Sequence, residues 1–243
     1  MGNIQFITIE TDLHGNKEKR LFESAAIHEI NIKMLGKGAK WNGFVTKLEI
    51  LKDYLESISI ETICFTDARD VLYMSNMETI YQTYLKQFGK DKIVFNGDTA
   101  CFPNSANASM HPKENEKYRF LNSGCVIGNR VLMINILSDA LEYYNTNTDI
   151  KDDQELLQYV FLSDKYGDDF TIDYNCHIFQ PIWDENGGRS NNFDLAYTED
   201  GIWNRLTRTK PLIIHHAGPT SIGDQAYKVL TGNYIKHTTH NFF

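Results

Sequence analysis

The sequence lacks an excess of basic residues. Its 243 residues include 24 Lys and Arg against 32 Asp and Glu, a formal net charge of -8 at pH 7. Proteins that bind nucleic acid usually present a basic surface to the phosphate backbone. A local basic groove could exist within an acidic chain, but the overall balance predicts no nucleic-acid partner.

Long apolar runs are also missing. No stretch approaches the roughly 20 apolar residues that a transmembrane helix needs, so we expect no membrane span. The first residues, MGNIQFITIETD, lack the basic segment and long apolar core of a signal peptide. We therefore expect the chain as given to be cytoplasmic.

Cysteine pairs and glycine-rich phosphate loops are absent. The four cysteines stand singly, without metal-ligand spacing, and are best interpreted as buried reduced thiols. Neither GxxxxGK[ST] nor GxGxxG occurs, so phosphate-loop and dinucleotide-binding folds have no support. There is no internal repeat and no Pro- or Gly-rich linker, which predicts a single domain over residues 1–243.

Strand and helix patterns alternate along the chain. Strands are predicted at 4–10, 61–67, 92–98, 119–129 (broken at Gly124), 170–180 and 210–216. Helices are predicted at 22–35, 41–58, 74–89, 131–145, 152–167 and 223–235, and an exposed loop at 102–117. This order predicts an α/β fold with a mostly parallel sheet flanked by helices, which binds ligands at the carboxyl ends of its strands.

Two aspartates end the apolar stretch in FTDARDVL, residues 65–72. A buried strand end does not tolerate Asp67 and Asp70 together unless something compensates their charge. Mg²⁺ or Mn²⁺ would do so, since both prefer oxygen ligands. Alternatively, Asp67 caps a following helix and Asp70 pairs with Arg69 or another neighbour. The spacing alone leaves both interpretations open.

A second acidic pair, Asp152 and Asp153, lies in KDDQELL. Asp152 with Glu155 three residues later is typical of a capping box at a helix start. The functional interpretation is a carboxylate pair that faces a positively charged reaction centre.

Further polar residues follow other strands. His215 ends LIIH and precedes Gly218 and Pro219, so it is either a core histidine, a metal ligand or a phosphate contact. A second histidine beside it and the Gly-Pro turn favour a site. Asp98 and Asn122 also lie at strand ends, where turn roles explain them equally well.

In this order, the motifs resemble those of a known family. The chain is similar over nearly its whole length to the glycosyltransferase domain of the procollagen lysyl hydroxylases, the collagen galactosylhydroxylysine glucosyltransferase domain, and to stand-alone relatives. The stretches that carry the resemblance are GKGAKWNGFVTKLEIL, FTDARDVL, FNGDTACFP, RFLNSGCVIG, DDQELL, IDYNCHIFQ, IIHHAGPT and LTGNYI. A stand-alone viral or microbial member would fit.

The resemblance implies a GT-A fold, a Rossmann-like sheet that binds a UDP-sugar with Mn²⁺, or with Mg²⁺ as the alternative. It implies that the metal ligands are Asp67, Asp70 and His215. It implies contacts with the nucleotide sugar from Ile9, Glu10, Thr11, Lys47, Ala68, Arg69, Gly218, Pro219 and Thr220. The catalytic residues that it implies are Asp98, Asn122, Asp152 and Asp153.

The implied reaction is a retaining transfer of a hexose, glucose before galactose, from a UDP-sugar to a hydroxyl. The implied acceptor is a collagen-like galactosyl-hydroxylysine or a related glycan. Members of the family often form dimers, so a homodimer is a further expectation, although no segment here indicates an interface. Family relatives work in the secretory pathway.

The chain departs from the family pattern at Phe102, Ala217 and Ser221, where Trp, Asn and Lys are typical. These positions bear on the sugar and the acceptor. Two alternative functions remain at this point: a metal-dependent nucleotide phosphohydrolase or nucleotidyltransferase, and a non-catalytic module that binds nucleotide sugars. The presence of all three implied metal ligands argues against the module.

Overall fold

The computed structural model describes residues 4–12, 17–113, 117–183, 194–198, 200–216 and 221–233, without the side chains of 221–224. The strands are β1 Ile4–Ile9, β2 Ile32–Leu35, β3 Thr62–Thr66, β4 Val71–Tyr73, β5 Ile93–Asp98, β6 Phe120–Asn129, β7 Phe170–Asp173, β8 Phe179–Pro181, β9 Leu195–Thr198, β10 Gly201–Asn204 and β11 Ile213–His215. The α-helices are α1 Lys19–Ile27, α2 Val45–Ser57, α3 Met77–Gln87, α4 Arg130–Thr146, α5 Asp153–Leu162 and α6 Ser221–Leu230. Two short 3₁₀ helices lie at Ser105–Ser109 and Gly167–Asp169.

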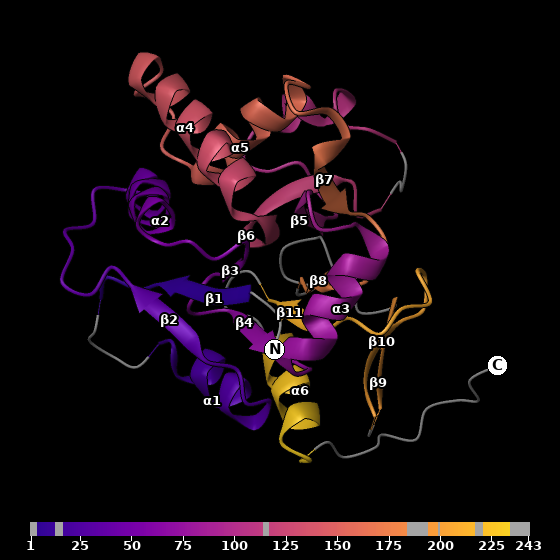
Figure 1. The fold of residues 1–243 in the computed structure, drawn as a ribbon. Helices are drawn as coiled ribbons and strands as arrows, with labels where there is room; N and C mark the ends of the chain where they lie inside the picture. Colours follow the sequence, from indigo (N-terminus) through magenta and orange to yellow (C-terminus); the bar gives the residue numbers. More distant parts are fainter. Residues whose placement is uncertain are drawn as a thin grey trace.

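A six-stranded sheet in the order β2-β1-β3-β6-β5-β7 forms the centre of the fold (Figure 1). β1 runs parallel to β2 and β3, and β5 runs parallel to β7. β6 runs antiparallel to both of its neighbours, β3 and β5. Five strands therefore share one direction, which confirms the mostly parallel sheet and brings the carboxyl ends of β1, β3, β5 and β7 to the same edge.

Helices α2, α4 and α5 cover one face of this sheet, in the upper part of Figure 1. Their apolar side chains pack on those of alternate positions in the strands. The buried residues of this cluster include Ile7, Leu48, Leu51, Phe65, Phe95, Val126, Met133, Ile136, Leu156 and Val160. This layer fixes α2 and α5, whose first turns reach the edge where the parallel strands end.

The opposite face is covered by α1, α3 and a second sheet in the order β4-β11-β8. β11 pairs antiparallel with β4 and parallel with β8. The far side of this small sheet packs on the β9–β10 hairpin and on α6. The second sheet matters for function because β4 and β11 carry residues to the strand-end edge of the first.

The helix predicted over 22–35 is wrong in its second half. α1 ends at Ile27, because Glu29 adopts a φ of +55° and the Ile30 amide donates to the Ala25 carbonyl, which closes the helix. The following residues then form β2, the edge strand beside β1. Apolar residues at helical spacing continue through 35, so periodicity alone did not mark this end.

The predicted break at Gly124 is correct for one side of the strand only. β6 is continuous and pairs with β3 as far as Cys125, but its pairing with β5 passes from Val126 opposite Phe95 to Asn122 opposite Asn96 and leaves out residues 123–125. Gly124 also lets the ring of His215 approach the backbone of β6, since a Cβ there would overlap that ring. The absence of a side chain at this position thus allows the two sheets to come into close contact.

The strand predicted over 170–180 is two strands, β7 and β8. The Asp173 carboxylate accepts hydrogen bonds from the backbone amides of His177, Ile178 and Phe179. Cys176, with a φ of +50°, completes the turn. The chain thereby leaves the first sheet and enters the second. Within the described residues, no helix has the length and apolar character needed to span a bilayer.

Candidate metal and nucleotide site

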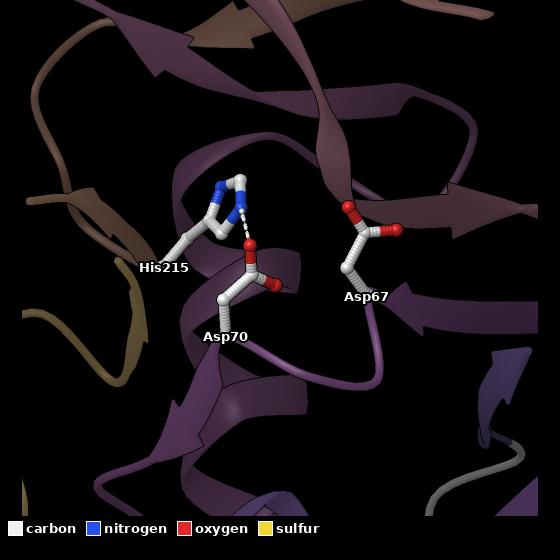
Figure 2. A group of neighbouring side chains, drawn as sticks. All are labelled: Asp67, Asp70 and His215. Carbon is white, nitrogen blue, oxygen red and sulfur yellow. Dashed lines mark ion pairs between the residues drawn. The ribbon is translucent and has the colours of Figure 1, made fainter. Parts of the chain in front are cut away.

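Three potential metal ligands meet where the two sheets join (Figure 2). Asp67 directly follows β3, Asp70 directly precedes β4, and His215 is the last residue of β11. The antiparallel pairing of β11 with β4 places His215 beside the Asp70 turn. One ligand atom from each of the three residues lies within 4.8 Å of the others, and Nε2 of His215 is 3.5 Å from Oδ2 of Asp70.

The helix-capping alternative for this motif is wrong. A strand, β4, follows Asp70, and the Asp67 side chain bonds to Lys47 rather than to a helix amide. The backbone amide of Asp67 donates to the Gly124 carbonyl at 2.8 Å, which anchors the turn on β6. Arg69 pairs with Glu10 and not with Asp70. The two carboxylates are thus held toward one another by the turn itself.

The local electrostatics favour a cation. Burial and the neighbouring Asp70 carboxylate raise the pKa of Asp67 to about 6, against the opposing charge of Lys47. Burial opposes ionisation of Asp70, but the His215 imidazole outweighs it and holds that pKa below its ordinary value. Burial likewise opposes protonation of His215, but the Asp70, Asp67 and Asp98 carboxylates raise its pKa. The positive charge around the adjacent carboxylates of Asp67 and Asp70 therefore does not balance their negative charge.

Lys47 joins this cluster to the second acidic pair. Its ammonium group lies 3.1 Å from Oδ1 of Asp67 and 2.6 Å from Oδ2 of Asp153. Both charges raise the pKa of Lys47 above its ordinary value despite its burial. Lys47 points there because α2 packs on the sheet with its first turn beside the end of β3.

Only one member of the second pair reaches the cluster. Asp152 is the N-cap of α5, and its Oδ1 accepts from the backbone amides of Gln154 and Glu155, which confirms the helix-start interpretation. Asp153 is buried and faces Lys47. Burial and the charge of Asp153 raise the pKa of Asp152.

A cleft of about 440 Å³ opens beside Asp67 and Asp70. Its lining combines the end of β1, the start of α2 and the turn after β3. The lining residues are Ile9, Glu10, Thr11, Asp12, Trp41, Phe44, Lys47, Asp67, Ala68, Arg69 and Asp70. The predicted nucleotide contacts from β1, α2 and this turn thus lie together on one surface, next to the proposed metal ligands.

A bidentate ion pair crosses the cleft wall. Nε and Nη2 of Arg69 donate to the two carboxylate oxygens of Glu10 at 2.5 and 2.7 Å. Burial opposes ionisation of Glu10, but Arg69 and the Asp12 amide outweigh it and hold the pKa below its ordinary value. This pair ties the end of β1 to the metal-motif turn.

Two aromatic residues of the cleft were missed by the sequence-based prediction. Trp41 and Phe44 are exposed although large and apolar, and their rings meet edge to face with centroids 5.5 Å apart. An exposed aromatic pair at a cleft offers stacking surfaces for a planar ring or a sugar. The signal was present in the sequence as WNGF, immediately before the helix that carries Lys47.

Asp98 and Asn122 lie together but outside the cleft lining. Oδ2 of Asp98 accepts from the Asn122 amide at 3.0 Å, and Oδ1 accepts from the Thr99 amide and from Nε1 of Trp183. Burial raises the pKa of Asp98. Both carboxylate oxygens are committed to these donors, so the Asp98 carboxyl group is held in a fixed position.

Several predicted positions fall at or beyond the limits of what the structure describes. Gly218, Pro219 and Thr220 lie outside the described residues, as does Ala217, and the side chain of Ser221 is not described. The Phe102 side chain is exposed, and its carbonyl accepts from the amides of Gln154 and Gln158. These bonds tie the loop after β5 to α5.

Comparison with known proteins identifies the family. A family model described as "PLOD GT domain" matches residues 1–241. The chain belongs to this family. It is 31% identical over 233 residues to a multifunctional procollagen lysine hydroxylase and glycosyltransferase of Caenorhabditis elegans, with 89% of this chain and 30% of that protein covered. It is 26% identical over 231 residues to Uncharacterized protein R699 of Acanthamoeba polyphaga mimivirus, with 89% of this chain and 47% of that protein covered.

The PLOD-type domain thus spans less than half the length of either relative. Its fold also resembles a solved structure of a glycosyltransferase involved in glycosylation of the major capsid of PBCV-1. The TM-score is 0.54 at 8% identity, with 94% of this chain and 98% of that chain covered. This likeness supports the GT-A-like fold that the sequence predicts.

The cluster of Asp67, Asp70 and His215 fits a divalent cation. Two carboxylates and one imidazole form a mixed oxygen and nitrogen donor set, with the negative charge in excess.

Proposed function

We propose that this PLOD-type domain transfers a hexose from a UDP-sugar to a hydroxyl acceptor with the help of Mn²⁺. The observation that carries the proposal is the cluster of Asp67, Asp70 and His215, whose two aspartates line a cleft together with aromatic and other acidic residues. Glycosyltransferase family membership restricts the chemistry to sugar transfer. Glucose is the first candidate for the hexose and galactose the second.

In this proposal, each side of the cleft binds one part of the donor. Trp41 and Phe44 stack on the uracil or ribose, and the Glu10–Arg69 pair fixes the adjoining wall. Asp67, Asp70 and His215 would hold Mn²⁺, which neutralises negative charge on the UDP leaving group when bound. The acidic edge of the cleft does not suit a diphosphate without such a cation.

Asp153 is the residue proposed to face the sugar. Its carboxylate is buried and lies 2.6 Å from the Lys47 ammonium group, which fixes its orientation. A carboxylate there stabilises positive charge on the anomeric carbon as the bond to UDP breaks. We propose that Asp98 and Asn122 position the acceptor side of the site through the backbone of β6.

The proposed stereochemical course is retention. The acceptor hydroxyl forms its bond to the anomeric carbon on the side from which UDP leaves, and its proton passes to a phosphate oxygen of the departing UDP. The names of several relatives include procollagen lysine. They support a collagen-like galactosyl-hydroxylysine, or a related glycan, as the acceptor.

The test is release of UDP from a panel of UDP-sugars, with Mn²⁺ or EDTA, with and without galactosyl-hydroxylysine. We expect release from one sugar, dependent on Mn²⁺ and increased by acceptor. Slow release that acceptor does not increase would reject the acceptor but keep the donor and the metal. No release from any UDP-sugar would reject the transferase in favour of a binding module.

A further inference from the structure

Asn96 is a polar side chain buried in an apolar part of β5. It is 0% exposed and follows Ile93, Val94 and Phe95, which all lie in the hydrophobic core. The register shift between Phe95 and Asn96 accompanies a contact with the second sheet, where Nδ2 of Asn96 lies 3.2 Å from Nδ1 of His215. Oδ1 of Asn96 is buried and has no hydrogen-bond partner among the described residues.

The His215 ring has little freedom to choose other partners. It lies against the backbone of β6 at Gly124, where even a methyl group would overlap Cε1, Nε2 and Nδ1. Its Nε2 edge faces Asp70, and its Nδ1 edge faces Asn96. A cation bound by Asp67, Asp70 and His215 therefore meets Nε2, and Asn96 meets the other nitrogen.

The chemistry of imidazole then requires an acceptor at Asn96. A neutral imidazole that binds a cation through Nε2 carries its proton on Nδ1, and that proton is normally held by an acceptor. With Nδ2 of Asn96 facing Nδ1, two donors would oppose each other. A half-turn of the amide about the Cβ–Cγ bond puts Oδ1 there instead. Because Oδ1 has no other partner, this turn breaks no bond that Oδ1 makes.

We infer that Asn96 is a positioning residue for metal binding: its Oδ1 accepts the Nδ1 proton of His215 and so presents the Nε2 lone pair to the cation. This inference rests on the metal site of the proposed function. It assigns a role in the site to a strand residue that touches neither the cleft nor, by this geometry, the cation itself.

The first test measures Mn²⁺ binding without nucleotide, from the electron paramagnetic resonance signal of free Mn²⁺. We expect Asn96→Leu, which fills the space but accepts no hydrogen bond, to weaken Mn²⁺ binding about 10- to 100-fold. Asn96→Asp restores an acceptor oxygen and should bind Mn²⁺ at least as tightly as the wild type. Equal affinity of wild type and Asn96→Leu would overturn the inference, as would an Asn96→Asp variant as weak as Asn96→Leu.

Asn204→Leu is the matched control. Asn204 is also fully buried, but its amide group donates to Oε1 of Gln180 in β8 and to the Tyr118 hydroxyl. It should lower the melting temperature and leave the Mn²⁺ affinity of the folded protein unchanged. If the wild type itself binds no Mn²⁺, the metal site and the proposed function fail together. Binding by the wild type with no effect of Asn96→Leu removes only the role of Asn96.

A second measurement uses the wild-type protein and does not depend on the stability of any variant. Nitrogen-15 spectra of histidine-labelled protein, loaded with diamagnetic Cd²⁺, report which nitrogen of His215 carries the proton. We expect the proton on Nδ1 and the metal on Nε2. Coordination through Nδ1, or an Nδ1 without a proton, would overturn the inference.

Discussion

Two acidic groups lie at the carboxyl ends of parallel strands of the same sheet, yet their surroundings differ. Asp173 ends β7, is fully buried, and accepts three backbone N–H bonds that close its own turn. Asp67 follows β3, and its side chain, 30% exposed, faces Lys47 and the Asp70 carboxylate. The backbone satisfies Asp173 completely, whereas Asp67 and Asp70 keep oxygens directed into shared space. A carboxylate at a strand end therefore marks a site only when the local backbone leaves it unsatisfied.

Two histidines repeat the contrast. His215 and His111 are almost equally buried, at 3% and 2% exposed. The ring of His215 faces Asp70 and Asn96, while the ring of His111 packs between Phe120 and Phe161. Burial, with the charge of Arg119, lowers the pKa of His111 to about 4. Equal burial thus produces a potential ligand in one place and a neutral core residue in the other.

The largest expected effect comes from removing a member of the metal cluster. Asp67→Ala should reduce transferase activity to background and abolish Mn²⁺-dependent binding of UDP, because it removes one of two carboxylate ligands. Titration calorimetry with UDP, with Mn²⁺ and with EDTA, measures the second effect. Asp53→Ala, on the exposed side of α2, is the control and should behave as the wild type. Wild-type turnover in Asp67→Ala would remove the assigned role.

Asp153 separates catalysis from binding. Asp153→Asn keeps the shape of the side chain but removes the charge proposed to face the anomeric carbon. We expect turnover to be lost while the dissociation constant for UDP with Mn²⁺ stays within about threefold of the wild type. The reason is that the variant keeps the interactions that bind UDP equally in the ground state and in the transition state. Steady-state kinetics measure turnover, and titration calorimetry on the same preparation measures the dissociation constant for UDP. A parallel loss of UDP affinity would instead make Asp153 part of the donor-binding surface.

Lys47→Met tests whether the cluster contains excess negative charge. Without metal, the free energy of unfolding should fall by about 3 to 5 kcal/mol, because Asp67 and Asp153 lose their shared cation. Mn²⁺ should stabilise this variant more than the wild type, since it supplies the missing positive charge. Lys52→Met, an exposed i,i+4 pair with Glu56 on the same helix, should change stability by about 0.5 kcal/mol or less. Equal responses to Mn²⁺ would contradict the interpretation.

Asp173→Asn tests the acidic group whose hydrogen bonds are all made within its own turn. The substitution replaces one carboxylate oxygen, which accepts hydrogen bonds from backbone amides, by an NH₂ group, which can only donate. We therefore expect the free energy of unfolding to fall by about 2 to 3 kcal/mol. Metal affinity of the folded protein should not change. Urea unfolding measures the first effect and Mn²⁺ titration the second, with exposed Asp168→Asn as control. A large loss of metal affinity in Asp173→Asn would contradict the distinction drawn between Asp173, which the backbone satisfies, and Asp67, which belongs to the metal cluster.

His111 gives the smallest effect, which appears only as pH dependence. Its folded pKa of about 4 lies below the ordinary value of 6.5, so the unfolded chain binds more protons between these pH values. Stability is therefore lost as pH falls through this window, by about 2 kcal/mol between pH 7 and 5. In His111→Phe this part of the loss should disappear from urea unfolding curves. An unchanged pH slope in His111→Phe would show that His111 is not the group responsible.

Local patterns predicted many elements of the fold correctly. The sheet with mostly parallel strands and the N-cap at Asp152 are confirmed, and the elements that were predicted occur in the predicted order, but β2, β4, β9 and β10 were not predicted. The end of α1 was missed because Glu29, a residue with no special turn preference, takes the left-handed conformation there. The boundary between β7 and β8 was missed because Asp173 closes the turn through backbone amides that come four to six residues later.

Sequence alone determined the family of this chain, the identities of the acidic and histidine residues, and the strand ends on which they lie. These properties depend on residue type and short-range order, and a single chain displays both. Only the tertiary structure decided which of those residues meet. It joins Lys47 to Asp153 across two helices and places Asn96 behind His215, through the pairing of β11 with β4 and the register shift of β5 against β6. Contacts of this kind depend on how sheets and helices pack, and no local spacing encodes them.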